Sequence, residues 1–296
     1  MLTLSSIYSL RLLKQAQSTR LSLPKRLRAL GEMAQRMDQF VTVAASAMPT
    51  EQAESDSPTP MPDAVDVATI LAEATQLVHE QLLPRMRRYR VQILTVEQLT
   101  EVQRAWLWPY FQQQIYPLLT PLAIDSGHPF PYLQSRRLNF LVALRAHVQP
   151  GAGRPRYGVV QIPARLPRLI QAQPCLPGRS AANRTRPLRC LVWREEIVRY
   201  FLPTLFSGLT VDAAYQFRLL RAQNDPAALS GPNVAEQRQG LAPAPVIRLD
   251  VEKSMPSHLR RWLINQLRVN DECVLDCATP LGLADLCQLA DYLAPH

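Results

Sequence analysis

The strongest constraint on the fold is a proline-rich apolar segment, residues 115–132, with the sequence IYPLLTPLAIDSGHPFPY. Proline fixes φ and lacks a backbone N–H, so neither a helix interior nor a central strand can run through such a segment. Its other residues are largely aliphatic or aromatic, which indicates burial. We therefore predict a rigid, buried connector between a helix at 97–114, capped by Thr95 or Thr100, and a strand at 138–144.

The N-terminal part of the chain has the spacing of helices. A first helix is expected at 9–17, and a second begins at Pro24, which suits the first turn of a helix. Residues 49–63 are polar and proline-rich, which predicts a linker without regular structure. A third helix is expected from there to about residue 89, with a break near Pro84.

The rest of the chain mixes strand and helix signals. Residues 138–144 and 157–162 are β-branched and aliphatic and predict adjacent antiparallel strands. Alternating or apolar runs predict further strands at 188–193, 215–220, 246–251 and 274–275, and helical spacing predicts helices at 194–201, 256–267 and 281–292. The predicted fold class is therefore α+β, with an all-helical N-terminal domain at 1–96 and a mixed α+β domain at 97–296.

The chain is basic, with a net charge of +9 and a pI near 9.7, and almost all of the positive charge is arginine. Guanidinium groups match phosphate oxygens in a two-pronged geometry, which favours an anionic partner such as polyphosphate or nucleic acid. For the choice of arginine over lysine, the codon bias of a GC-rich genome is the favoured explanation. That explanation leaves the net charge in place.

Composition also bears on the compartment. The five cysteines form no C-x-x-C pair, which favours free thiols in a reducing cytoplasm over disulfides or a zinc site. No apolar run is long enough to span a membrane. At the N-terminus Arg11 and Lys14 follow the apolar residues, whereas a signal peptide has its charges first. We expect a cytoplasmic protein, with peripheral contact to the membrane left open.

Several blocks resemble one family. Residues 100–132, TEVQRAWLWPYFQQQIYPLLTPLAIDSGHPFPY, followed by RRLNFLVAL, closely resemble the polyphosphate kinase family of long-chain bacterial enzymes. Residues 23–40 resemble the family's N-terminal helical motif, and residues 246–289 resemble the end of its head domain. Residues 215–225, YQFRLLRAQND, resemble its F-R-x-x-R-N-x-D segment.

The resemblance implies the N-terminal and head domains of such an enzyme. In the family, the phosphorylated histidine and the phosphate-handling arginines lie in two C-terminal domains that follow the head domain. The sequence ends at His296, where those domains would begin, so we expect a chain that is inactive alone. ATP and Mg²⁺ are implied as cofactors of the full enzyme, with none bound by this chain itself. A homo-oligomer through the head domain and separately encoded catalytic domains are the implied partners.

The resemblance also points to a nucleotide-facing residue. The family's second helix carries an S-N-L-D-E-F-like signature whose asparagine contacts the nucleotide, and residues 35–40 read QRMDQF here. Arg36 stands at the asparagine position, where an amide that donates and accepts has become a donor-only cation. This change weakens base recognition but leaves Arg36 able to hold a phosphate.

Four other arginines are candidates for contact with a polyanion. These are Arg136 and Arg137, which precede a predicted strand, and Arg218 and Arg221. A solvated strand end explains the first pair as well as a polyanion site does.

No catalytic or metal-binding motif is found. The sequence has no G-x-x-x-x-G-K-[ST], no G-x-G-x-x-G after a strand, no H-E-x-x-H and no G-x-S-x-G. His128, in the proline-rich segment, has two possible roles: an acid–base group, or a packed histidine with a structural role. We favour the second interpretation, and for Asp125 a turn. We therefore predict no catalytic residue and no metal ligand.

Three functions remain open. The first is a polyphosphate kinase module that works in ATP-dependent polyphosphate synthesis together with phospho-histidine domains. The second is a non-catalytic relic that acts as an interaction or polyanion-binding protein. The third, a nucleic-acid binder, is supported by charge alone, since few aromatic residues lie among the arginines.

Overall fold

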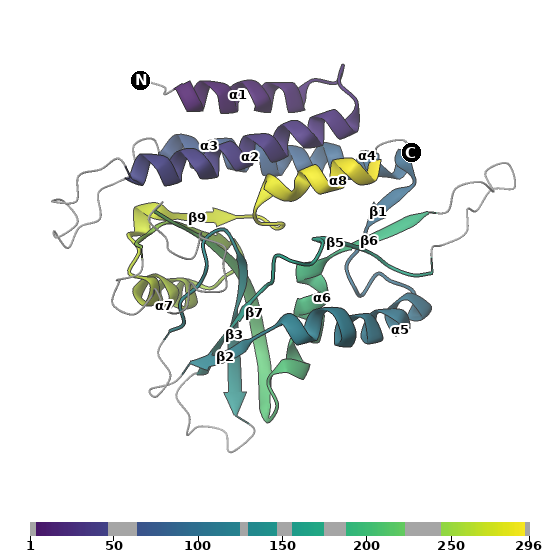
Figure 1. The fold of residues 1–296 in the computed structure, drawn as a ribbon, viewed down its shortest axis with the longest axis vertical. Helices are drawn as coiled ribbons and strands as arrows, with labels where there is room; N and C mark the ends of the chain where they lie inside the picture. Colours follow the sequence, from purple (N-terminus) through teal and green to yellow (C-terminus); the bar gives the residue numbers. More distant parts are fainter. Residues whose placement is uncertain are drawn as a thin grey trace, which may run out of the picture.

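The structure is a computed structural model, and it describes residues 4–46, 64–124, 130–146, 156–174, 188–222 and 244–293. Four of the helices form one layer that lies along the sheets, while α5, α6 and α7 lie outside it (Figure 1). Helix α2 is central to this layer, because both α1 and the last helix, α8, pack against it. The helices of the layer are α1 (Leu4–Gln17), α2 (Leu23–Ser46), α3 (Ala64–Leu77) and α8 (Leu286–Leu293).

The larger sheet has six strands, in the order β2-β4-β3-β7-β8-β9. Neighbouring strands are antiparallel except for β8 and β9, which are parallel. The strands are β2 (Pro121–Ile124), β3 (Leu138–Ala146), β4 (Arg156–Gln161), β7 (Leu209–Arg221), β8 (Val246–Glu252) and β9 (Val274–Cys277).

A smaller sheet of three strands, in the order β1-β6-β5, lies beside it. Its strands are β1 (Val91–Ile93), β5 (Leu169–Gln171) and β6 (Arg189–Trp193). Helix α6 (Arg194–Phe201) with its 3₁₀ turn η7 (Leu202–Leu205) follows β6 directly, and helix α7 (Ser257–Leu267) with η9 (Asp271–Cys273) joins β8 to β9. The predicted α+β class is confirmed.

Two helices change their winding near proline. The helix that starts at Ala64 continues as a π-helix, η2 (Val78–Leu82), a short α-turn, α4 (Leu83–Arg85), and a 3₁₀ turn, η3 (Met86–Tyr89). Pro84 lacks the donor that a regular helix needs there, so the predicted break is confirmed. Helix α5 (Glu101–Tyr110) likewise passes into η4 (Phe111–Ile115), a π-helix, and η5 (Tyr116–Leu118).

The start of α5 confirms one of the two predicted caps. Thr100 and Gln103 form a capping box, in which the Gln103 N–H donates to Thr100 Oγ1 at 3.3 Å and the Thr100 N–H donates to Gln103 Oε1 at 3.2 Å. The helix therefore begins four residues later than the predicted start at 97.

The proline-rich connector differs from the prediction. Its middle forms the edge strand β2, which pairs with β4 from Pro121 to Ile124. Proline is tolerated at the first position of an edge strand because no ladder bond is lost there. The prediction of burial is wrong for Leu118 and Leu122, each 40% exposed.

The core crosses the predicted domain boundary. One apolar cluster joins Leu30 of α2 and Val78 to Leu191 of β6 and Leu289 of α8. Strand β1 was missed by the prediction of an all-helical segment at 1–96, and it pairs in parallel with β6. The division into 1–96 and 97–296 stays a prediction.

Several predicted features lie outside the described residues, namely the linker at 49–63 and the residues Asp125 and His128. Within the described part of the chain, no helix combines the length and the apolar character that a membrane crossing needs.

Candidate functional site

Helix α2 carries the QRMDQF motif, and it presents that motif to two different environments. Arg36 lies on the exposed side of the helix, with 52% of its side chain accessible. Asp38, two residues later, is buried. Each helical residue is rotated by about 100° from the one before, so residues two apart point in nearly opposite directions. One motif therefore supplies both a surface cation and an interior anion.

The interior anion is the centre of a buried ionic cluster. The cluster joins Asp38 to Arg218 on β7 and to Arg248 and Asp250 on β8, and each of these four residues is at most 5% exposed. Arg218 binds both oxygens of Asp38, with Nη1 lying 3.3 Å from Oδ1, and the same Nη1 lies 3.2 Å from Asp250 Oδ2. Two cations and two anions make the cluster neutral overall.

Arg248 completes the cluster. Its Nη1 lies 3.2 Å from Asp38 Oδ1, while its Nε and Nη2 donate to the two oxygens of Asp250 at 2.7 and 2.8 Å. This is the parallel, two-pronged geometry in which a guanidinium binds a carboxylate best. Asp38 is thus bound by arginines from two neighbouring strands, which fixes α2 against the large sheet.

The cluster keeps its charges in the interior. Burial alone would raise the pKa of Asp38, but the adjacent guanidinium groups of Arg218 and Arg248 outweigh it, so the pKa lies below its usual value. Burial alone would lower the pKa of Arg218, but the carboxylates of Asp38 and Asp250 outweigh this effect, so the pKa lies above its usual value. Both partners stay ionised at neutral pH.

A second buried arginine lies across a glycine from this cluster. Arg168 donates twice to Glu195 Oε1, at 2.9 and 2.6 Å, and once to Asp285 Oδ2 at 3.0 Å. Gly282 separates the two systems, because a Cβ added there would lie 3.4 Å from the Arg218 side chain and 3.7 Å from Arg168 Nη1. Its φ of +70° also favours glycine. A cavity of about 20 Å³ beside Arg218 and Gly282 could hold one water molecule.

The exposed side of α2 carries a small polar cluster. Arg36 Nε lies 3.2 Å from Glu32 Oε1, and the guanidinium carbon of Arg36 lies 4.6 Å from the centroid of the Tyr8 ring on α1. The Tyr8 hydroxyl donates to the same Glu32 oxygen at 3.4 Å. Arg36 is thereby oriented by an acid and an aromatic face while its outer edge meets solvent.

The predicted polyanion residues occupy different environments. Arg136 and Arg137 form the turn before β3, where Arg136 has a φ of +64°. Arg136 Nη2 lies 3.4 Å from Thr42 Oγ1 on α2, so this exposed arginine approaches the end of the motif helix. Arg137 is half-buried and lines a cavity at the edge of the large sheet.

Arg218 and Arg221 both lie in the interior. Arg218 belongs to the ionic cluster described above. Arg221 donates to the carbonyl oxygens of Leu133 at 3.0 Å and Ala244 at 2.6 Å, and its guanidinium carbon lies 4.5 Å from the centroid of the Tyr132 ring. The structure therefore does not bring these two arginines to the surface that carries Arg136.

Sequence reasoning missed Asp38, Arg248 and Asp250 as a unit. A signal was present, because Arg248 and Asp250 alternate on one face of a strand that is otherwise apolar, VIRLDV. Charged residues at buried-face positions of a strand need partners of opposite charge. The partner, Asp38, could not be located from spacing, since it lies 210 residues from Arg248.

The described residues do not form a metal centre. Within these ranges no three His, Cys, Asp or Glu side chains converge as ligands. The ionic cluster contains two carboxylates, but each is already bound by guanidinium groups. The donor set therefore does not fit a Mg²⁺ ion in this part of the chain.

Comparison with known proteins gives a consistent result. A family model described as the polyphosphate kinase middle domain matches residues 102–228. The polyphosphate kinase of Lactiplantibacillus plantarum is 30% identical over 306 residues, which cover 98% of this chain and 40% of that protein. The polyphosphate kinase of Parasynechococcus marenigrum is 26% identical over 299 residues, covering 94% of this chain and 41% of that protein.

A solved structure shares the fold. The crystal structure of polyphosphate kinase from Porphyromonas gingivalis superimposes with a TM-score of 0.74 at 18% sequence identity, and the match covers 99% of this chain and 40% of that one. The chain thus spans about 40% of the length of the relatives it matches.

Proposed function

This chain belongs to the polyphosphate kinase family, and we propose that it works in the ATP-dependent synthesis of inorganic polyphosphate as a scaffold. In this role it presents a nucleotide-facing surface on α2 without carrying the phosphoryl group itself. Phosphoryl transfer is assigned to residues outside the 296 of this chain, supplied in the same polypeptide or by a separate one.

The observation that carries the proposal is the opposite orientation of Arg36 and Asp38 on α2. Asp38 is held by Arg218 and Arg248 from the sheet, so α2 cannot rotate without breaking a buried ionic cluster. Arg36 is therefore held in a fixed direction toward solvent. Preorganised cations bind anions with less loss of conformational entropy than mobile ones do.

The chemistry of Arg36 favours the phosphates of the nucleotide over its base. A guanidinium has five N–H donors and no acceptor, so it cannot read the mixed donor and acceptor edge of adenine as an amide does. It matches two phosphate oxygens well. ATP with Mg²⁺ is the substrate of the assembled enzyme, and no metal ligand is assigned to this chain.

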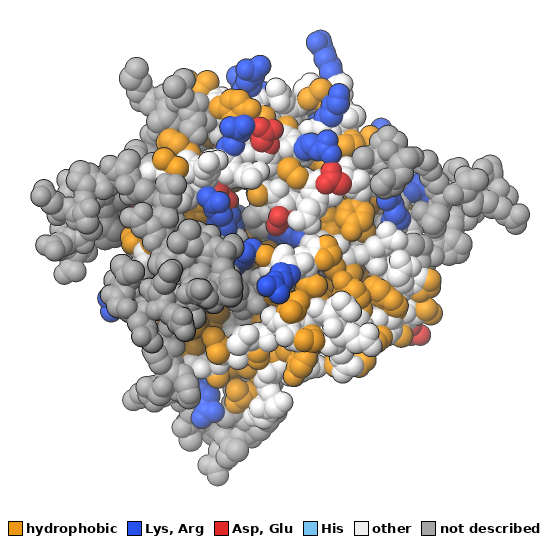
Figure 2. Space-filling view, viewed as in Figure 1, with side chains coloured by type: hydrophobic (Ala, Val, Ile, Leu, Met, Phe, Trp, Pro, Cys, Tyr) orange, Lys and Arg blue, Asp and Glu red, His pale blue; other side chains and the backbone are white. Residues whose placement is uncertain are grey.

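A polyanion contact is proposed for the turn that carries Arg136 and Arg137. Arg136 is exposed and contacts Thr42 on the side of α2 that carries Asp38, so it would offer a phosphate chain a second cationic contact, separate from Arg36. Figure 2 shows Lys and Arg side chains scattered over the helical layer, with hydrophobic side chains gathered lower on the same face. Arg218 and Arg221 are buried and are not part of the proposed contact.

A homo-oligomer through the α5 and α6 region is part of the proposal. Trp108, Tyr116 and Tyr200 are 39%, 49% and 43% exposed. Their rings are linked through Phe111 and Phe201, with centroid distances between 4.5 and 6.1 Å. Phe111 and Phe201 are buried, so the three exposed rings are joined through the interior, and exposed aromatic side chains of this kind are enriched at protein interfaces.

The second candidate function is a non-catalytic polyanion-binding protein, and the presence of Arg36 in place of the family's asparagine favours it. The two readings differ in what the α2 surface binds. A scaffold for the kinase binds nucleoside triphosphates. A non-catalytic polyanion-binding protein instead binds polyphosphate through net charge alone, and its affinity falls steeply as the salt concentration rises.

Calorimetric titration of ATP and GTP into the purified chain tests the proposal. We expect both nucleotides to bind with similar affinity, because Arg36 holds the phosphates. Arg36→Gln should weaken both roughly tenfold, the value of one charge-assisted hydrogen bond, while Arg261→Gln on α7, a matched loss of one exposed charge, should not. Equal binding by the Arg36→Gln chain and the unaltered chain would contradict the proposal.

A further inference from the structure

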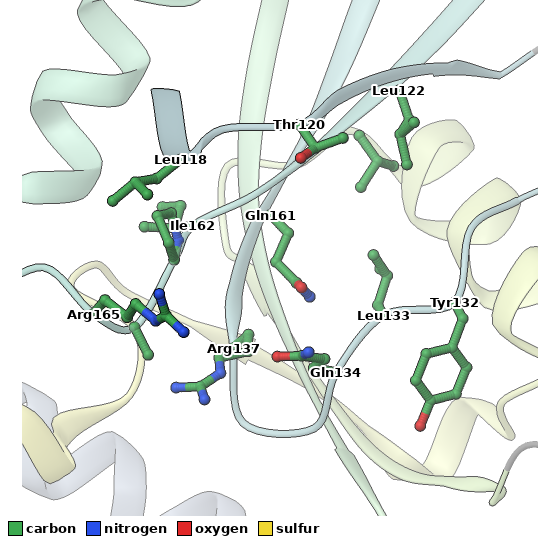
Figure 3. Close-up of a pocket in the computed structure, with 13 residues that line it drawn as sticks. Leu118, Thr120, Leu122, Tyr132, Leu133, Gln134, Arg137, Gln161, Ile162 and Arg165 are labelled. Atoms are coloured by element: carbon green, nitrogen blue, oxygen red, sulfur yellow. The ribbon is translucent and has the colours of Figure 1, made fainter. Parts of the chain in front are cut away.

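A cavity of about 400 Å³ opens at the edge of the large sheet, and its lining includes neither Arg36 nor a member of the ionic cluster (Figure 3). It is lined by β2 and β4 and by the segments that precede β3 and follow β4. Its volume lies within the range of cavities that hold small organic ligands.

The polar side of this cavity is cationic. Arg137 and Arg165 reach it from the two flanking segments, and Figure 3 shows them at one end in that view, with Tyr132 at the other. Thr120, Gln134 and Gln161 add hydroxyl and amide groups. None of the 13 lining residues is Asp or Glu, so the lining supplies no anion for the two guanidinium groups.

The cationic side is built on a rigid base. Asn139, which is fully buried, donates from Nδ2 to the Arg137 carbonyl oxygen at 3.0 Å and accepts from Gln161 Nε2 at 3.2 Å. The turn before it is fixed by a bond of 2.7 Å from the Arg136 N–H to the carbonyl of Leu219. The backbone of Arg137 and the side chain of Gln161 are therefore held in place by contacts within the protein.

The charges around Arg194, which senses Arg137, are mixed. Burial is the main cause that lowers the pKa of Arg194, the carboxylates of Glu195 and Asp285 act against it, and the guanidinium groups of Arg168 and Arg137 lower it further. Within the lining itself, Arg137 and Arg165 are present without a carboxylate, which creates a positive potential that an anion would relieve.

The opposite wall is apolar and partly uncovered. Leu133, Val159 and Ile162 are buried at its floor, whereas Leu118 and Leu122 at its rim are each 40% exposed. Inorganic phosphate or a bare polyphosphate chain would leave this apolar wall in contact with water. A ligand with an apolar body would cover it, at a gain of about 25 cal/mol per Å² buried.

We propose that this cavity binds a small organic phosphate, with the phosphate on Arg137 and Arg165 and a flat apolar body against Leu118 and Leu122. The guanidinium pair suits the two negative charges of a phosphate monoester. This site lies beyond the proposed function and does not depend on Arg36, so the two proposals can fail separately.

Calorimetry with the full purified chain tests the site with three probes: 1-naphthyl phosphate, inorganic phosphate and 1-naphthol. We expect 1-naphthyl phosphate to bind at least roughly tenfold more tightly than either of the others, because only it uses both walls. Arg137→Gln and Arg165→Gln should each weaken it about tenfold. Leu122→Ala should weaken it roughly threefold, and the exposed controls Arg261→Gln and Val102→Ala should leave it unchanged.

Two results would overturn the proposal. One is 1-naphthyl phosphate binding no more tightly than inorganic phosphate, which would remove the organic body from the ligand. The other is an equal loss of affinity in the Arg261→Gln control, which would mean that net charge and not the cavity is responsible. Thermal unfolding of each variant checks that a lost affinity does not reflect a lost fold.

Discussion

Arg218 of β7 binds the carboxylate of Asp38 on α2, with Nη1 lying 3.3 Å from Oδ1, although 180 residues separate the two along the chain. Both side chains are buried, and Arg248 and Asp250 complete their pairing. This pair ties the helix that carries Arg36 to the large sheet. The position of the candidate nucleotide-facing surface therefore depends on an interior contact.

Removing Arg218 should destabilise the protein strongly. Arg218→Met leaves two buried carboxylates with one remaining arginine. Removing one partner of a buried ion pair lowers the free energy of unfolding by about 3–5 kcal/mol. Denaturant titration measures the free energy of unfolding.

Arg145→Met is the matched control for that experiment. This substitution breaks the exposed ion pair in which Arg145 Nη2 lies 2.7 Å from Asp212 Oδ1. It should lower the free energy of unfolding by less than about 1 kcal/mol. Similar losses in the two variants would show that the buried cluster does not anchor α2.

Stability should fall in acid because of two carboxylates. Burial alone would raise the pKa of Glu252, but hydrogen bonds from the Arg199 side chain and the Gln216 N–H outweigh it, so its pKa lies below the usual value, as does that of Asp38. A carboxylate with a lowered folded pKa stabilises the fold above its unfolded pKa of about 4 and loses that contribution as the pH falls through the folded value.

Glu196 acts in the opposite direction, because burial raises its pKa. The net prediction is a lower free energy of unfolding at pH 3 than at pH 6. Glu252→Gln should show a shallower decline than the unaltered chain, as measured by urea titration at each pH. Parallel declines in the two proteins would remove Glu252 from this explanation.

The contact between α2 and α8 has no room for a methyl group at Gly31. An added Cβ would lie 2.5 Å from Cys287 Sγ and 3.0 Å from the Ala284 carbonyl oxygen. Gly31→Ala should therefore cost about 1–3 kcal/mol of stability through overpacking.

Gly208→Ala is a useful comparison for the Gly31 substitution. Gly208 has open space around it and a φ of +77°, so only backbone strain of about 1 kcal/mol is expected. Thermal unfolding with calorimetric enthalpies measures both variants. A Gly31→Ala protein as stable as the unaltered chain would mean that α8 does not pack on α2 this closely.

Much of the fold could be predicted from local pattern. Strands at 138–144 and 246–251 followed from apolar and alternating residues, and Pro84 marked the break in its helix. Strand β1 was missed because three residues give no periodicity. Strand β2 was missed because its prolines argue against a strand, and only its place at the sheet edge makes them tolerable.

The candidate site was less predictable, for a physical reason. Local pattern places Arg218 in a strand but says nothing of what faces it, and the answer is a residue on a helix far away in sequence. An arginine committed to an interior carboxylate looks the same in sequence as one offered to solvent. The same limit hid the cavity at Arg137, whose walls come from three separate segments.

The cysteine thiols should react slowly in the folded protein. Burial raises the pKa of Cys277 well above its usual range and also raises that of Cys273, so little reactive thiolate is present at pH 8. In a Cys175→Ala background, which removes a cysteine outside the described residues, we expect labelling by a disulfide reagent at least about tenfold slower at these two positions than in urea. Equal rates would contradict the burial of Cys273 and the raised pKa of Cys277.

The most direct test of the central claim is incubation of the purified chain with γ-labelled ATP and Mg²⁺, followed by separation of labelled polyphosphate and of alkali-stable protein phosphate. If the chain is a scaffold that presents nucleotide but does not carry phosphate, neither product should accumulate with time. Growth of a labelled phosphate chain, or a stable phosphohistidine on this protein, would contradict the account.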